Sequence, residues 1–112
     1  MAKAMLLAWS NPIDEASDGE FNAWYDDTHV PQVRATIPAI TAVQRYRQAD
    51  LPAEAGASSV HRYLAVYEMD TDDVAGAIAA LGAAVAAGQL DLTTTMDLTT
   101  NPPVLHWYQA VD

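Results

Sequence analysis

The segment FNAWYDDTHVPQV, residues 21–33, places three aromatic rings, two aspartates, a histidine and a proline within thirteen positions. Phe21, Trp24 and Tyr25 recur at the spacing of one helix face. Pro31 has no amide hydrogen, so it removes the hydrogen bond to the carbonyl four residues earlier. The segment therefore predicts a helix that is kinked or restarted near its end.

The chain on either side of this segment predicts how the helix is framed. Ser17 and Glu20 are spaced as a capping box, in which the serine hydroxyl binds a free amide and the glutamate reaches back to the serine amide. Ile37 and Pro38 predict the end of the helix. Before it, residues 3–9 form a short apolar run that stops at a turn signal, as a buried strand does.

The middle of the chain predicts a strand pair. Residues 40–48 alternate in polarity and are rich in β-formers, and residues 61–69 give the clearest strand pattern. Residues 50–59 carry proline, glycine and small side chains, so we expect them to form a flexible surface connection between the two strands.

The remainder predicts a second helix and a last strand. The aspartates after Thr71 favour a helix start, and the helix is expected to end near Gly88. Its apolar stripe is predicted to comprise Val74, Ile78, Leu81 and Val85. Residues 89–103 are assigned to a loop, with a short strand or turn within it as the alternative, and residues 104–111 to a final strand.

The element order β-α-β-β-α-β predicts an α+β fold over residues 1–112 as one domain. It is the order of a ferredoxin-like protomer, with both helices on one face of a four-stranded antiparallel sheet. The first strand is apolar at both alternating phases, with Met5 and Leu7 against Leu6 and Ala8. Two helices cover one face, so we expect the other face to be buried in a two-fold homodimer.

Composition narrows the class of partner. Fifteen acidic against five basic residues give a formal charge of −10, which disfavours nucleic acid and anionic lipid. No apolar run approaches the roughly 20 residues of a membrane span. The absence of cysteine excludes disulfides and thiolate chemistry. We expect a soluble, cytoplasmic protein.

His29 is the first candidate for chemistry. On a helix it lies near Tyr25 and Asp26, which are four and three residues earlier. An imidazole both takes and gives a proton near neutral pH, and a neighbouring carboxylate orients the ring, so this set suits a general acid and base. The structural alternative stays open, because a histidine near a helix end often answers the helix dipole and aromatic residues usually pack the core.

The strands supply further candidates. Arg45 shares a strand phase with Arg47 and offers positive charge to an anionic or phenolate ligand, although a surface ion pair with an acidic residue on a neighbouring strand is the simpler explanation. Tyr46 lies on the opposite phase, while Tyr63 and Tyr67 share a face. Their hydroxyls are candidates for binding an enol or phenol oxygen, with a packing role as the alternative.

Motifs for metals and cofactors are missing from the sequence. It has no His-x-x-x-His or His-Glu-x-x-His pair, no glycine-rich phosphate loop and no serine-centred elbow. We therefore expect no metal and no cofactor, with haem ligation by a single histidine as the remaining alternative.

The segment EFNAWYDDTHVPQV, the Ile37-Pro38 pair and the strand AVQRYR together resemble the EthD-like branch of the dimeric α+β barrel superfamily. The resemblance implies a ferredoxin-like protomer, a homodimer, and a ligand pocket between helix and sheet. Related barrels include cofactor-free cyclases, isomerases, dehydratases, lyases and quinone-forming monooxygenases. In several branches a pocket histidine moves the proton, and by motif that role falls on His29.

The leading hypothesis is a cofactor-independent enzyme that transfers protons on a small, apolar, oxygenated cyclic or polyketide-like molecule. His29 is the general acid and base, and Asp26 or Tyr25 orients it. The expected substrate-binding residues are Trp9, Trp24, Tyr46, Arg45, Tyr63 and Tyr67. A cofactor-free quinone-forming monooxygenase and a non-catalytic small-molecule binding protein are the alternatives.

Overall fold

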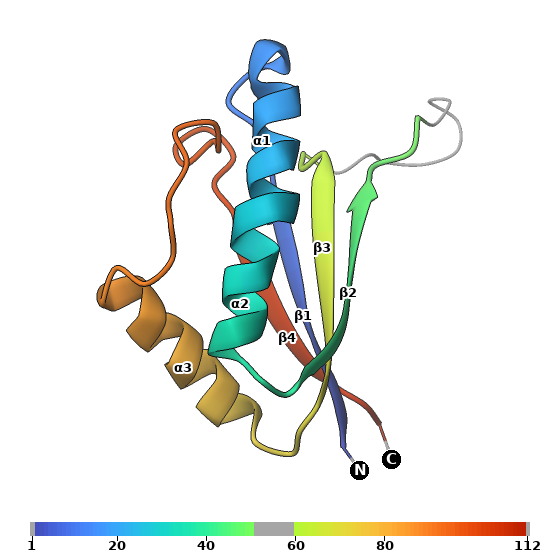
Figure 1. The fold of residues 1–112 in the computed structure, drawn as a ribbon. Helices are drawn as coiled ribbons and strands as arrows, with labels where there is room; N and C mark the ends of the chain where they lie inside the picture. Colours follow the sequence, from blue (N-terminus) through green and yellow to red (C-terminus); the bar gives the residue numbers. More distant parts are fainter. Residues whose placement is uncertain (1, 51–59, 112) are drawn as a thin grey trace.

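The sheet and its helices have the predicted ferredoxin-like arrangement in the computed structural model, which describes residues 2–50 and 60–111 (Figure 1). The strands are β1 (Lys3–Ser10), β2 (Ile40–Arg47), β3 (Tyr63–Asp70) and β4 (Val104–Gln109). They form one antiparallel sheet in the order β2-β3-β1-β4. The predicted fold class is therefore confirmed. Apart from Asp50, the predicted connection at residues 50–59 lies outside the described residues.

The first helical segment runs through three elements. It comprises α1 (Asp18–Trp24), a π-helical turn η2 (Tyr25–His29) and α2 (Val30–Thr36). The amide of Val30 donates to the carbonyl of Tyr25, five residues earlier, as in a π turn. The predicted restart near Pro31 is thus a single widened turn followed by α2, and the predicted end before Ile37 is confirmed.

The start of this helix corrects the predicted capping box. A short 3-10 turn, η1 (Glu15–Ser17), precedes α1, and the Ser17 side chain makes no capping hydrogen bond. Instead, Asp14 Oδ1 accepts a hydrogen bond of 2.8 Å from the amide of Ser17. The prediction was wrong because Asp14 offers an acceptor one turn earlier, so the chain begins to coil before Ser17.

Both ends of the second helix, α3 (Val74–Ala86), follow ordinary capping chemistry. Asp73 Oδ1 accepts a hydrogen bond of 2.9 Å from the amide of Gly76. Gly88 takes a φ of 70°, and the next amide, of Gln89, bonds back to the carbonyl of Ala84. The left-handed conformation suits glycine and ends the helix as predicted.

The face that α3 buries differs from the predicted stripe. Ile78 and Val85 are 45% and 58% exposed, while Ala77, Leu81 and Ala84 are buried. The predicted stripe is confirmed for Val74 and Leu81, which pack on the core, and wrong for Ile78 and Val85, because an alanine-rich helix is apolar on every side. The pattern of larger side chains then does not determine its orientation, and the alanine face permits a closer approach to the rest of the fold.

The core lies between the sheet and the helices. The strand residues of the core are Ala4, Leu6, Ala8, Ile40, Tyr63, Ala65, Tyr67 and Met69. Its largest helical members are Phe21, Tyr25, Val33 and Leu81. On the opposite sheet face, Tyr46 and Tyr108 are 53% and 51% exposed. Within the described ranges, no helix is long and apolar enough to cross a bilayer.

Candidate functional site

A cavity of about 370 Å³ lies on the helical side of the sheet. Its walls come from β1, β3, β4, the helical segment α1-η2-α2, α3 and the 89–103 loop, and most of its lining is apolar. The aromatic and polar members of that lining are Trp9, Ser10, Trp24, Tyr25, His29, Tyr67 and Asp91. The volume lies at the small end of the roughly 300–1,000 Å³ of small-molecule sites.

The π turn determines which rings meet at this cavity. The rings of Trp24 and His29 stack with centroids 4.6 Å apart and 22° between their planes. Residues five apart point in different directions on a regular α-helix, but a π turn brings them together. Tyr25 meets the same imidazole edge-on, with centroids 4.9 Å apart. His29 is therefore clamped between two aromatic neighbours.

The imidazole of His29 is uncharged at neutral pH. Burial lowers its pKa from 6.5 to about 4, and the positive charge of Arg45 acts in the same direction. Its Nδ1 atom is buried and has no hydrogen-bond partner among the described residues. A neutral imidazole beside a cavity is in the form that accepts a proton.

Two hydroxyl groups share this lack of partners. Ser10 is 2% exposed and Tyr67 is 1% exposed, yet neither hydroxyl oxygen has a hydrogen bond within the part of the chain that the structure describes. Burial raises the pKa of Tyr67, and its neighbour Tyr25 adds to the effect. Burial likewise raises the pKa of Tyr25, with Tyr67, Arg45 and Ser10 offsetting part of the rise. Both phenols are therefore neutral donors.

Ser10 was missed in the sequence. Leu6, Ala8 and Ser10 share one phase of β1 and are all buried. The signal in the sequence was a serine in the same phase as two buried apolar residues. It went unused because the strand was predicted to end at residue 9.

Arg45 and Asp26 interact with each other on the side of the helix that faces β2. Arg45 Nη1 donates to Asp26 Oδ1 at 2.9 Å, and Nη2 donates to Asn22 Oδ1 at 2.8 Å. The guanidinium also lies 4.4 Å from the centroid of the Tyr25 ring. Arg45 does not line the cavity, and Asp26, with a side chain 60% exposed, pairs with Arg45 rather than with His29.

The three remaining candidates lie in different places. Tyr63 is buried behind α1, where its hydroxyl donates to Asp18 and accepts from Asn22. Tyr46 lies half exposed on the opposite face of the sheet. Trp9 belongs to the residues that border the cavity, but it is in the outward phase of β1, and its ring packs edge-on against His106 on the other face of the sheet.

The predicted 89–103 loop is present and closes one side of the cavity. Trp24 Nε1 donates to the carbonyl of Asp91 at 3.2 Å. Gln32 Nε2 donates to Asp91 Oδ2 at 3.0 Å, and the Asp91 amide donates to Gln32 Oε1 at 2.8 Å. A loop tied to the helix at one residue becomes a fixed wall, a tertiary contact that the local sequence does not encode.

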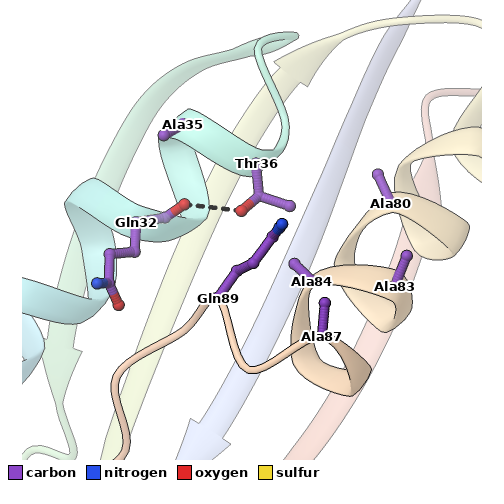
Figure 2. A pocket seen from close by; sticks show the side chains of 8 residues that line it. All are labelled: Gln32, Ala35, Thr36, Ala80, Ala83, Ala84, Ala87 and Gln89. Atoms are coloured by element: carbon purple, nitrogen blue, oxygen red, sulfur yellow. Dashed lines mark hydrogen bonds between the residues drawn. The ribbon is translucent and has the colours of Figure 1, made fainter.

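A second hollow, of about 560 Å³, lies between α2 and α3 (Figure 2). It is larger and more open, and its lining is alanine with Gln32, Thr36 and Gln89. None of these side chains titrates or reacts near neutral pH, so the His29 cavity is the candidate site. The described residues contain no group of three or more His, Asp or Glu positioned to hold a metal ion.

Comparison with known proteins identifies the family of the chain and two structures with a similar fold. Residues 14–90 match the model of the EthD domain. An ethyl tert-butyl ether d (ethd) family protein of Bacillus halodurans is 18% identical over 99% of this chain and 100% of its own, with a TM-score of 0.57. An ethd-like protein of Ralstonia eutropha is also 18% identical, over 96% of this chain and 92% of its own, with a TM-score of 0.57. No curated protein matches the chain. The two structures bear on the fold alone.

Proposed function

The chain belongs to the EthD domain family, and we propose that this member is a cofactor-independent enzyme that transfers protons on a small, apolar, oxygenated molecule. The observation that carries the proposal is a neutral, partly buried imidazole on the wall of an apolar cavity. Proton abstraction needs a positioned base and a site that excludes water, and both features support that chemistry.

His29 is the proposed general acid and base. It removes a proton from carbon next to a carbonyl group and returns it at another position, which gives isomerisation, cyclisation or elimination. Cyclic or polyketide-like molecules are the proposed substrates, since they combine such carbons with an apolar skeleton.

Tyr25 is the proposed positioning residue for His29. Its ring contacts the imidazole edge-on, whereas Asp26 is engaged by Arg45. Trp24 is the proposed stacking partner that holds the imidazole plane against the cavity.

The proposed assembly is a homodimer through the outer face of the sheet. Met5, Leu7, Leu64 and Val66 are only partly buried there, beside the half-exposed Tyr108. Packing two sheets face to face would bury this surface. Light scattering at micromolar concentration should give twice the chain mass, and a strict monomer would refute the dimer.

The catalytic role is tested by hydrogen exchange on a simple ketone. The protein is incubated with 1-tetralone in D₂O, and loss of the proton signal next to the carbonyl is followed by NMR. Wild type should accelerate exchange, and His29→Gln should reduce that acceleration by roughly 10²-fold or more. His106→Gln is the matched control, because His106 is exposed on the other face of the sheet. An unchanged rate in His29→Gln would remove the role of His29.

A further inference from the structure

We propose that the hydroxyls of Ser10 and Tyr67 form a binding site for the oxygen of an uncharged carbonyl compound, beside His29 in the cavity. The part played by His29 rests on the function proposed above. The binding of the oxygen does not, because it depends only on the two hydroxyls and the apolar walls. Ser10 thereby gains a role in ligand recognition, and the substrate class narrows to uncharged ketones and related carbonyl compounds.

The first argument is the hydrogen-bond inventory of the cavity. Buried polar groups in proteins almost always have partners, and a buried group without one costs on the order of 1–3 kcal/mol. Here Ser10 Oγ, Tyr67 Oη and His29 Nδ1 have no partner in hydrogen-bonding geometry among the described residues, although the Tyr25 hydroxyl lies near enough to Ser10 and Tyr67 to interact with both, and all three residues line the same cavity. Three such atoms at one hollow are explained together if the partner is a ligand.

The second argument is what these groups can bind. The hydroxyls of Ser10 and Tyr67 donate hydrogen bonds, and Tyr67 keeps its proton because burial raises its pKa. Both also lie close enough to Tyr25 to influence its ionisation, which places them in one neighbourhood. A carbonyl oxygen has two lone pairs and accepts from two donors.

The third argument is charge. Among the described residues, no lysine or arginine lines the cavity, since Arg45 is held outside it by Asp26, Asn22 and the Tyr25 ring. Asp91 is the acidic residue of the lining, and the whole chain carries a charge of −10. A carboxylate or phosphate in this cavity would lose its hydration without gaining a countercharge. An uncharged ligand avoids that cost.

The same arrangement serves the proposed proton transfer. When His29 takes a proton from the carbon next to the carbonyl, the electrons of that C–H bond form a C=C bond. The π electrons of the C=O bond move to the oxygen, where the two hydroxyls stabilise the negative charge that develops. Return of the proton to carbon or oxygen completes the step without an oxidant, a reductant or a further reactant.

The test is a binding series on one skeleton. Titration calorimetry measures the Kd of 1-tetralone, of tetralin, which lacks the oxygen, and of 1,2,3,4-tetrahydro-1-naphthoate, which carries a carboxylate. Wild type should bind the ketone about 10-fold more tightly than either analogue, since one satisfied buried hydrogen bond accounts for roughly that factor.

The variants separate the hydroxyls from the cavity as a whole. Ser10→Ala and Tyr67→Phe should each reduce the ketone preference to about 3-fold or less, with the Kd of tetralin unchanged. Tyr108→Phe is the control, because it removes a tyrosine hydroxyl on the other face of the sheet and should keep the preference. Circular dichroism confirms that each variant is folded.

The outcomes distinguish this proposal from the catalytic one. Equal affinity for ketone and hydrocarbon, a preference that survives both substitutions, or no binding of any of the three compounds at millimolar concentration would overturn the oxygen site. A ketone preference without hydrogen exchange would support the oxygen site and refute the catalytic role of His29. Hydrogen exchange without a ketone preference would support the catalytic role of His29 and refute the oxygen site.

Discussion

Two tyrosines on β3 show how the two sides of the first helical segment, α1-η2-α2, differ. Tyr63 and Tyr67 lie four residues apart on the same face of β3, and they are 6% and 1% exposed. The Tyr63 hydroxyl is bonded to Asp18 and Asn22, whereas the Tyr67 hydroxyl has no partner within the described residues. The same residue type at the same depth is fully satisfied in one place and unsatisfied at the other. The Tyr63 hydroxyl therefore belongs to a structural network, whereas the Tyr67 hydroxyl is one of the two that we propose bind a ligand oxygen.

The structural network holds the helix from behind. Arg45 on β2 binds Asn22 in α1 and Asp26 in the π turn, and its guanidinium covers the Tyr25 ring. These contacts fix the turn whose other side presents His29 to the cavity. Satisfied polar groups on one side therefore position unsatisfied ones on the other.

The largest expected effect is the pH dependence that His29 confers on stability. Its folded pKa, about 4, lies below the 6.5 of the unfolded chain, so the unfolded state binds the proton first as the pH falls. The stability that the neutral ring contributes is complete above pH 6.5 and is lost between pH 6.5 and 4. The groups that face the ring are Trp24, Tyr25 and, through its charge, Arg45.

Urea unfolding at pH 7.0 and pH 4.5 measures this term. Wild type should lose about 2–3 kcal/mol more than His29→Gln over that interval, because the other titrating groups cancel in the comparison. Equal losses would mean that the ring is not held in its neutral form.

The next largest effect is the loss of stability when the contacts of Arg45 are removed. Arg45→Met removes an ion pair, a charged hydrogen bond and a ring contact made by a side chain only 14% exposed. We expect the free energy of unfolding to fall by about 2 kcal/mol. Asp26→Asn should cost at most about 1 kcal/mol and less at high salt, because that carboxylate is largely solvated. Equal costs for the two variants would show that Arg45 acts only through Asp26.

The smallest expected effect is the change in stability when the hydroxyl of either tyrosine on β3 is removed, and it tests the comparison of the two tyrosines directly. Tyr63→Phe should cost about 1 kcal/mol, because it removes the hydrogen bonds that the Tyr63 hydroxyl makes with Asp18 and Asn22. Tyr67→Phe should leave stability unchanged or raise it by up to about 1 kcal/mol, because it removes an unsatisfied buried hydroxyl. Chemical denaturation of the two variants measures both values. A comparable loss in Tyr67→Phe would show that its hydroxyl has a partner in the apo protein.

The sequence contained most of the fold. Each element is marked by a local pattern, such as the proline that follows His29 or the glycine that ends α3, so the element order and the sheet could be predicted. The wrong predictions concern positions where two nearby residues, or two faces of a helix, can take the same structural role. Asp14 replaced Ser17 as the cap, and the alanines of α3 hid which side faces inward.

Less of the site was accessible to the sequence. Helical spacing placed His29 near Tyr25, but the neighbour of Asp26 is Arg45 from a distant strand. Likewise, Asp91 closes the cavity through Gln32, which lies 59 residues earlier. Side chains brought together by tertiary packing leave no periodic signal, and a missing hydrogen bond is visible only when every neighbour is known.

The central claim is that the hydroxyls of Ser10 and Tyr67 donate hydrogen bonds to the oxygen of a bound ligand. A crystal structure of the protein with bound 1-tetralone tests this claim most directly. We predict the ketone inside the cavity, with its oxygen within about 3.2 Å of Ser10 Oγ or Tyr67 Oη and its ring carbons against the apolar walls beside His29. A ketone bound with its oxygen turned away from both hydroxyls, or a cavity filled by the protein's own side chains, would contradict the account.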